Sequence, residues 1–188
     1  FVEPHFKMLW SEDIPYYTSE DGKTKVKEIS GSLGDVKALT PAPDSWAADP
    51  AHEVAIWTIT MQPGAEWTLP LASREANRSL YFYSGGSVQL NDQNLPLEKA
   101  AELDASQAVT IKNGDQEAKF LVLQGKPINE PVAQYGPFVM NTQAEIQQAF
   151  QEYQRTQFGG WPWPKNDHVH PKESGRFAKH ADGKEEYK

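Results

Sequence analysis

The sequence predicts a mainly β protein, an antiparallel barrel or sandwich followed by one amphipathic helix and an extended tail. Short segments with alternating apolar and polar residues recur between positions 23 and 124, with turn sequences between them. A helix-capping sequence and apolar residues at helical spacing follow at 142–157. Beyond Gly159 the chain is rich in proline and charged residues, which is typical of an extended tail.

The predicted strands are short and come at regular intervals. The first is KTKVKEIS at 23–30, and the next, VAIWTITM at 54–61, ends at the turn Gln62-Pro63-Gly64. The others are expected at 66–69, 79–84, 87–91, 95–98, 101–104, 108–113 and 118–124. Asn91-Asp92 and Asn113-Gly114-Asp115 are hairpin turn sequences. Many short strands with tight turns favour an antiparallel barrel or sandwich.

The stretch 124–142, QGKPINEPVAQYGPFVMNT, is neither a central strand nor a helix interior. Three prolines interrupt it, and proline has no backbone N–H to donate. It is nevertheless too apolar for a solvated linker. We therefore expect a packed connector that fastens the following helix onto the β-domain.

A helix is predicted from Gln143 to about Gln157. Thr142 and Glu145 form a capping box, in which each side chain accepts a hydrogen bond from the other residue's backbone amide. Four apolar residues at helical spacing form a stripe that is expected to dock on the barrel: Ile146, Ala149, Phe150 and Tyr153. Gly159-Gly160 ends the helix, and the last residues are expected to be frayed.

Composition excludes several classes of function. The 188 residues contain no cysteine, which rules out disulfides, thiolate metal ligands and a cysteine nucleophile. A net charge of −8 argues against nucleic acid or an anionic membrane surface as a direct partner. No apolar run approaches the roughly 20 residues of a membrane span, and no signal peptide is visible. We expect a cytoplasmic protein.

Several motifs resemble those of one protein family. GKPINEPVAQYGPFVMNT at 125–142, EIQQAFQEYQ at 145–154, and FGGWPW and GRFA in the tail resemble the C-terminal half of pirin-family proteins. SWAADPAHEVAIWTITMQPGAEWTLP at 45–70 resembles the bacterial branch of that family. The resemblance covers almost the whole chain, and the GPFVMNT block is its most specific part.

The resemblance implies a cupin, that is an RmlC-like jelly roll, within a two-barrel (bicupin) protein. Residues 1–22 would be an inter-domain junction, 23–140 the C-terminal cupin barrel, 141–158 its capping helix and 159–188 the tail. The family's metal, usually iron, lies in the N-terminal barrel, bound by three histidines and one glutamate. That barrel would precede Phe1 and be absent from this chain. It is the expected partner of this chain, and another protein is a further candidate.

The family's metal motif has no counterpart in this barrel. It requires two histidines spaced HxH on one strand, a glutamate soon after, and a later histidine. Aligned by Gly64 and Gly85, the histidine positions fall at Pro70, Ala72 and Val109, and the glutamate position falls at Arg78. No histidine occurs between Glu53 and Asp167. We therefore expect no metal, no cofactor and no catalytic residue on this chain, and iron or another divalent metal in the missing cupin.

The five histidines do not form an obvious site. His168, His170 and Glu173 resemble the front of a cupin motif, but they lie in the proline-rich tail with too little chain after them to complete it. A solvated tail is favoured over a metal site there. His5, His52 and His180 are each predicted to be surface or hydrogen-bonded residues.

Six residues on the predicted strands are candidates for lining the barrel interior: Trp57, Glu66, Trp67, Arg78, Tyr81 and Tyr83. One interpretation is an aromatic core with an ion pair. The other is a small-molecule pocket that has lost its metal.

Three alternative functions are compatible with these observations. The first is a metal-free cupin that has a structural and partner-binding role beside a metal-binding N-terminal cupin. The second is one half of an iron-dependent enzyme, because some bacterial pirins resemble quercetin 2,3-dioxygenases. The third is a transcription-related regulatory binding protein, because eukaryotic pirins are nuclear and associate with transcription factors.

Overall fold

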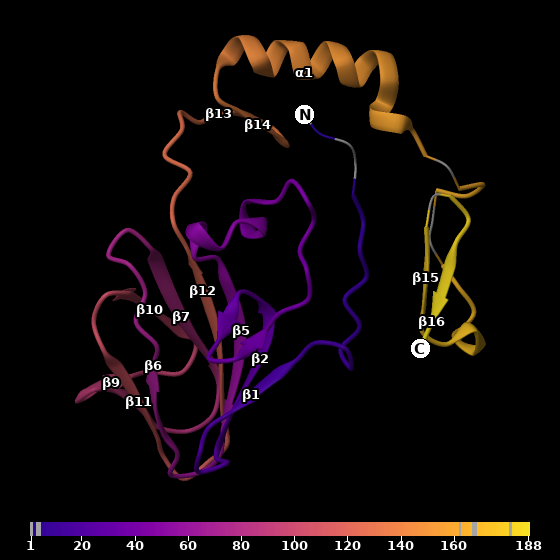
Figure 1. Cartoon of the computed structure of the whole chain (residues 1–188). Helices are drawn as coiled ribbons and strands as arrows, with labels where there is room; N and C mark the ends of the chain where they lie inside the picture. Colours follow the sequence, from indigo (N-terminus) through magenta and orange to yellow (C-terminus); the bar gives the residue numbers. More distant parts are fainter. Residues whose placement is uncertain (1, 3–4, 162, 167–168, 181) are drawn as a thin grey trace. The chain divides into compact units, whose positions relative to one another are not determined.

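A computed structural model describes residues 2, 5–161, 163–166, 169–180 and 182–188. The chain forms two compact units, the first ending at Pro127 and the second beginning at Ile128 (Figure 1). This division comes earlier than the end of the barrel at 140 that the sequence predicts.

The first unit contains two antiparallel sheets, as the sequence predicts. The larger has the strand order β1 (Tyr16–Thr18), β2 (Thr24–Ser30), β5 (Ala55–Met61), β12 (Ala118–Gly125), β7 (Asn77–Ser84) and β10 (Lys99–Asp104). The smaller has the order β6 (Glu66–Leu69), β11 (Val109–Asn113), β8 (Val88–Leu90) and β9 (Gln93–Leu95). Short elements complete the unit: β3 (Ser32–Leu33), β4 (Val36–Lys37), and the 3-10 helices η1 (Trp46–Ala48) and η2 (Pro50–His52).

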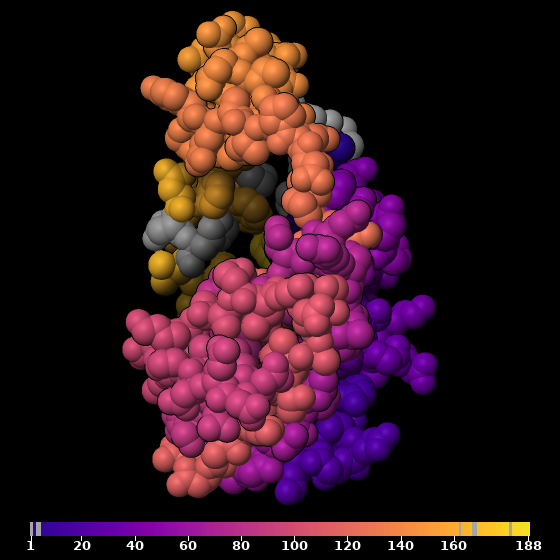
Figure 2. Space-filling model, turned by 90° about the vertical axis from the view of Figure 1, so that its left-hand side faces the viewer, coloured from indigo at the N-terminus to yellow at the C-terminus, as the bar shows by residue number. Residues whose placement is uncertain are grey.

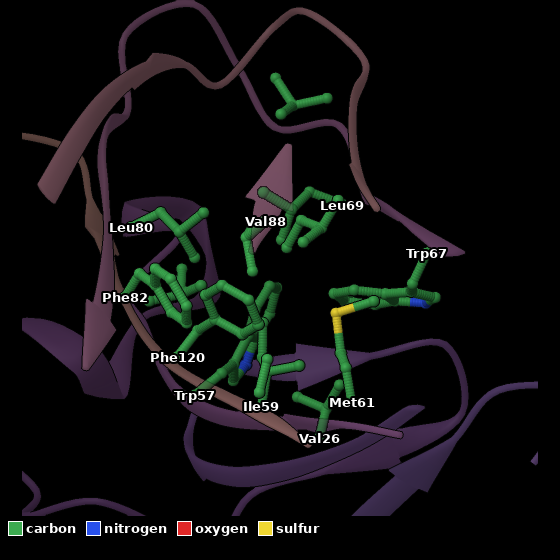
Figure 3. Close-up of a cluster of buried hydrophobic side chains, with 14 of the residues drawn as sticks. Val26, Trp57, Ile59, Met61, Trp67, Leu69, Leu80, Phe82, Val88 and Phe120 are labelled. Atoms are coloured by element: carbon green, nitrogen blue, oxygen red, sulfur yellow. The ribbon is translucent and has the colours of Figure 1, made fainter. Parts of the chain in front are cut away.

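Side chains from both sheets fill the space between them, as Figure 3 shows. Along β5, every second residue from Ala55 to Met61 is buried, which is the alternation expected of a strand with one face on a core. The Phe82 and Phe120 rings are stacked with centroids 5.1 Å apart. Each large apolar side chain buried in this way stabilises the fold by about 1.5–3 kcal/mol. The mainly β sandwich that the sequence predicts is therefore confirmed.

Two sequence predictions in this unit need correction. The strand expected at 95–98 ends at Leu95, because Pro96 cannot donate to a ladder and Glu98 has a left-handed φ of 60°. The predicted junction at 1–22 is not wholly an arm: Tyr16–Thr18 pairs antiparallel with β2 and forms an edge of the larger sheet. The alternating sequence from Tyr16 to Thr18 was too short to be recognised as a strand.

The second unit begins with a hairpin and a helix. Strands β13 (Ala133–Tyr135) and β14 (Phe138–Met140) pair across Gly136-Pro137, and helix α1 spans Gln143–Thr156. The Phe150 ring of α1 lies 4.6 Å from the Phe138 ring, centroid to centroid. The sequence predicts that this helix face docks on the barrel. The Phe150 ring contacts the Tyr135 and Phe138 rings of the hairpin, and docking on the barrel stays a prediction.

The tail is more ordered than an extended segment. After η3 (Gln157–Gly159) and η4 (Lys172–Ser174), strands β15 (Phe177–Lys179) and β16 (Glu185–Tyr187) pair antiparallel. Lys179 and Glu185 form an ion pair of 3.0 Å across the hairpin. The expectation that the last residues are frayed is therefore wrong for Glu185–Tyr187. In the described part of the chain, no helix is long and apolar enough to cross a membrane.

Replacing Thr142 with alanine is expected to weaken α1 by about 1 kcal/mol. The Thr142 hydroxyl accepts from the Glu145 amide at 3.2 Å, and the Glu145 carboxylate accepts from the Thr142 amide at 2.8 Å. Amide hydrogen exchange along α1 would measure the loss. Thr142→Ser, which keeps the hydroxyl, is the control and should exchange as the unmodified protein does. Equal exchange in both variants would contradict a role for the capping box.

Candidate functional site

The positions that the metal motif would use lie in the first unit and carry no metal ligand. Val109 is buried on β11 and pairs with Leu69 of β6, the residue that precedes Pro70. Pro70 and Ala72 are half-buried, and the inward residue nearest them on β6 is Leu69, which has no ligand atom either. The fourth position, Arg78, is a cation. These residues do not fit a divalent metal, and no cluster of three or more ligand residues occurs within the described ranges.

Arg78 is the most unusual residue of this group, because its side chain is only 1% exposed. It begins the inward face of β7, two residues before Leu80. Its Nε donates to Oε1 of Gln124 at 2.7 Å, and Nε2 of Gln124 donates to the backbone carbonyl of Glu53 at 2.9 Å. Burial lowers the pKa of Arg78, and the charge of Glu53 acts in the opposite direction. The guanidinium is thus held inside the sandwich through one of its three nitrogens.

The Glu53 carboxylate has its own partners at this end of the sandwich. It accepts from the Ser73 backbone amide at 3.0 Å and from the Ser73 hydroxyl, and Lys126 Nζ lies 3.4 Å away. The hydrogen bond from the Ser73 hydroxyl is the main cause that lowers the pKa of Glu53. Glu53 is therefore engaged by Ser73 and Lys126, and no ion pair joins it to Arg78.

Glu28 is a second buried ionisable group, and none of the motifs considered above includes it. It lies directly opposite Trp57 across β2 and β5, and both side chains are on the inward face. Burial raises the pKa of Glu28 to about 7, and the nearby backbone N–H of Leu33 acts in the opposite direction. The alternation of Thr24, Val26 and Glu28 in KTKVKEIS is the signal that could have identified it.

The six predicted pocket residues do not come together. Trp57 and Arg78 are buried in the larger sheet, and Trp67 is buried in the smaller one. Glu66, Tyr81 and Tyr83 lie on outward faces, with Tyr81 and Tyr83 exposed by 38% and 50%. The prediction is wrong for these three. Strand residues an odd number of positions apart, such as 66 and 67 or 78 and 81, face opposite sides of the sheet.

Three of the four described histidines contact residues six or seven positions away in the sequence. The His52 ring stacks on Trp46 with centroids 3.3 Å apart, and its Nδ1 lies 2.7 Å from the Trp46 carbonyl. His180 Nε2 is 2.9 Å from a Glu186 oxygen, and the His170 ring contacts the Phe177 ring. His5 is exposed. His168 lies outside the described residues, so the HVH sequence is not described as a unit.

Comparison with known proteins places this fold in a family. The family model described as the pirin C-terminal cupin domain matches residues 56–159. A pirin-like protein of Solanum lycopersicum is 31% identical over 156 residues, which cover 81% of this chain and 50% of the relative. Human pirin is 31% identical over 165 residues, covering 84% of this chain and 52% of human pirin.

A solved structure agrees with these relatives. The crystal structure of a quercetin 2,3-dioxygenase from Acinetobacter baumannii superposes with a TM-score of 0.65 at 29% identity, over 81% of this chain and 50% of that one. This chain thus spans about half the length of the relatives it matches. The chain belongs to the pirin family, and residues 56–159 correspond to the family's C-terminal cupin domain.

Proposed function

We propose that this chain is a metal-free cupin with a structural and partner-binding role beside a metal-binding cupin of the intact protein. The observation that carries the proposal is the buried guanidinium of Arg78. It stands where the family's motif requires a carboxylate ligand. A fixed positive charge at that position repels a divalent cation, and the interior offers too little water to screen the repulsion.

The greater length of the relatives supports a partner domain within the intact protein. The matched relatives are about twice as long as the region they share with this chain. The first partner we propose is accordingly another cupin domain of the same protein, and a separate protein is the second. A supporting domain needs no catalytic residues. Its interior polar residues can therefore contribute to stability and to ligand binding.

Metal analysis tests the absence of a metal. The chain is purified without chelators, incubated anaerobically with Fe²⁺, desalted and analysed for iron. We expect far less than one iron per chain, because no imidazole lies on the interior strands. Substituting alanine for both histidines of the HVH sequence should remove any remaining trace. One iron per chain that survives this substitution would overturn the proposal.

A second candidate is that the intact protein is a quercetinase-like dioxygenase of which this chain is one half. The Acinetobacter baumannii structure, which carries that name at 29% identity, favours it. Oxygen consumption by the intact protein with quercetin, with and without iron, is the direct assay. Iron-dependent turnover would support the candidate, and its absence with iron fully loaded would reject it.

A further inference from the structure

Three buried side chains of the first unit carry polar atoms that make no hydrogen bond within the protein. They are Arg78, through both Nη1 and Nη2, Trp57, through Nε1, and Glu28, through both carboxylate oxygens. Within the described ranges, no protein group satisfies these atoms. Buried polar groups are nearly always hydrogen-bonded, so atoms of this kind are expected to bind ordered water or a ligand.

The strand register places Arg78 two strands from Trp57 and three strands from Glu28, at the end of the sandwich where β7 begins. Glu28 pairs with Trp57 across β2 and β5. Two residues earlier on β5, Ala55 pairs with Gln124 of β12, which in turn pairs with Arg78 of β7. Residues two apart on a strand face the same side, so Arg78 lies in the inward row next to that of Trp57 and Glu28. Its hydrogen bond to Gln124 directs the side chain across β12 and toward β5.

The charge of Arg78 has no counter-ion in direct contact. Glu53 is the acidic residue whose charge acts on it, but that carboxylate is engaged by Ser73 and Lys126. Leaving a guanidinium buried with two unpaired nitrogens is costly, because both its charge and its N–H groups lose water. An anion at Nη1 and Nη2 would remove both costs.

We propose that this end of the sandwich binds a small organic carboxylate, held by Nη1 and Nη2 of Arg78, with the indole N–H of Trp57 as an additional donor. The planar fork of a guanidinium matches the two oxygens of a carboxylate. One carboxylate also neutralises one guanidinium, whereas a phosphate dianion would leave an excess negative charge in the interior. This site does not depend on whether the chain binds a metal, because its ligand is an anion and its binding groups are not metal ligands.

A pocket connects this end of the sandwich with the surface. It has a volume of about 360 Å³ and is lined by Arg78 together with residues at the start of β7 and the end of β10. Arg74 on its wall adds a second guanidinium, and Glu102 and Asp104 add two carboxylates. Figure 2 looks onto the side of the first unit on which β7 and β10 lie, in magenta and pink. A carboxylate can therefore approach Arg78 from this side.

Nuclear magnetic resonance of the tryptophan side chains tests the site in the full chain. Acetate, inorganic phosphate and chloride are titrated at constant ionic strength while the indole N–H signals are recorded. We expect acetate to shift the Trp57 signal in a saturable manner. The Trp46 signal is the internal control and should not respond in this way, because its N–H already donates to the Lys126 carbonyl at 2.9 Å.

Substitutions identify the binding group. Arg78→Met removes the charge at similar length and should weaken acetate binding about tenfold or more. Arg155→Met makes the same chemical change at an exposed position of α1 and should leave binding unchanged. If Arg78→Met does not fold, Trp57→Phe takes its place, with stabilisation by acetate in thermal unfolding as the measurement, and the stabilisation should be reduced. No saturable response to acetate, a response to phosphate alone, or undiminished binding in the folded variant would each overturn the proposal.

Discussion

Replacing Asn113 with alanine is expected to lower the free energy of unfolding of the sandwich by about 2–4 kcal/mol. Asn113 is buried, and its Nδ2 donates to three backbone carbonyls: Met61 at 3.1 Å, Gln62 at 2.9 Å and Gln116 at 2.7 Å. Two N–H bonds serve three acceptors, so at least one is shared. Alanine would remove a buried donor from all three carbonyls, of which only that of Gln62 is shown to keep another, the Ala65 amide, outside the strand ladders.

The measurement is urea unfolding followed through the amide signals of β12, which report on the first unit alone. Asn94→Ala, at an exposed position of β9, is the matched control and should change stability by less than about 0.5 kcal/mol. Asn113→Asp keeps the shape but replaces the donor with a carboxylate, and it should be at least as destabilising as alanine. If Asn113→Ala is no worse than Asn94→Ala, the three hydrogen bonds contribute nothing to stability.

Asn113 also shows what the sequence can predict about the fold. Asn113-Gly114-Asp115 predicts a turn, and the chain does turn there between β11 and β12. The sequence does not predict that the asparagine side chain reaches back to the turn after β5, because that contact joins residues about 50 positions apart. Local turn chemistry and strand alternation can be read from neighbouring residues. Contacts between distant segments depend on the order of strands in the sheet.

The same distinction explains the errors in the fold. Alternation identified most strands, but the order β1-β2-β5-β12-β7-β10 pairs segments that are far apart in the chain. The sequence does not predict the hairpin β15–β16, because its strands are short, half of their residues are charged, and such segments resemble a solvated tail. Its stability comes from cross-strand pairs such as Lys179 with Glu185, which appear only once the register is known.

The candidate site was predicted in part. The resemblance to pirins located Arg78 at the position of a metal ligand, and the structure buries that residue. Glu28 was missed because a single glutamate in a lysine-rich strand resembles a solvated face. Tyr81 and Tyr83 were selected for their chemistry, although their parity on β7 is opposite to that of Leu80 and Phe82. The odd or even position of a residue along the strand therefore predicts whether its side chain faces the interior better than its residue type does.

Stability of the sandwich is expected to fall as the pH rises from about 5 to 8, because Glu28 must ionise inside the fold. Burial raises the pKa of Glu28 to about 7, against an ordinary value of 4.5. Between these two values the folded state binds more protons than the unfolded state, so the free energy of unfolding decreases with pH. The full change from Glu28 is about 3 kcal/mol, and it is complete once the pH exceeds the folded-state pKa.

Glu28→Gln tests this assignment, because the amide is neutral at every pH. The variant should remove the part of the pH dependence that Glu28 causes, and its advantage over the unmodified protein should grow from pH 5 to pH 8 by about 2–3 kcal/mol. Urea unfolding followed through the β12 amides measures both profiles. Glu66→Gln, at an exposed position of β6, is the control and should follow the unmodified protein. Parallel profiles for Glu28→Gln and the unmodified protein would mean that Glu28 is ionised in the fold across this range, with a donor such as the Trp57 indole or bound water sustaining its charge.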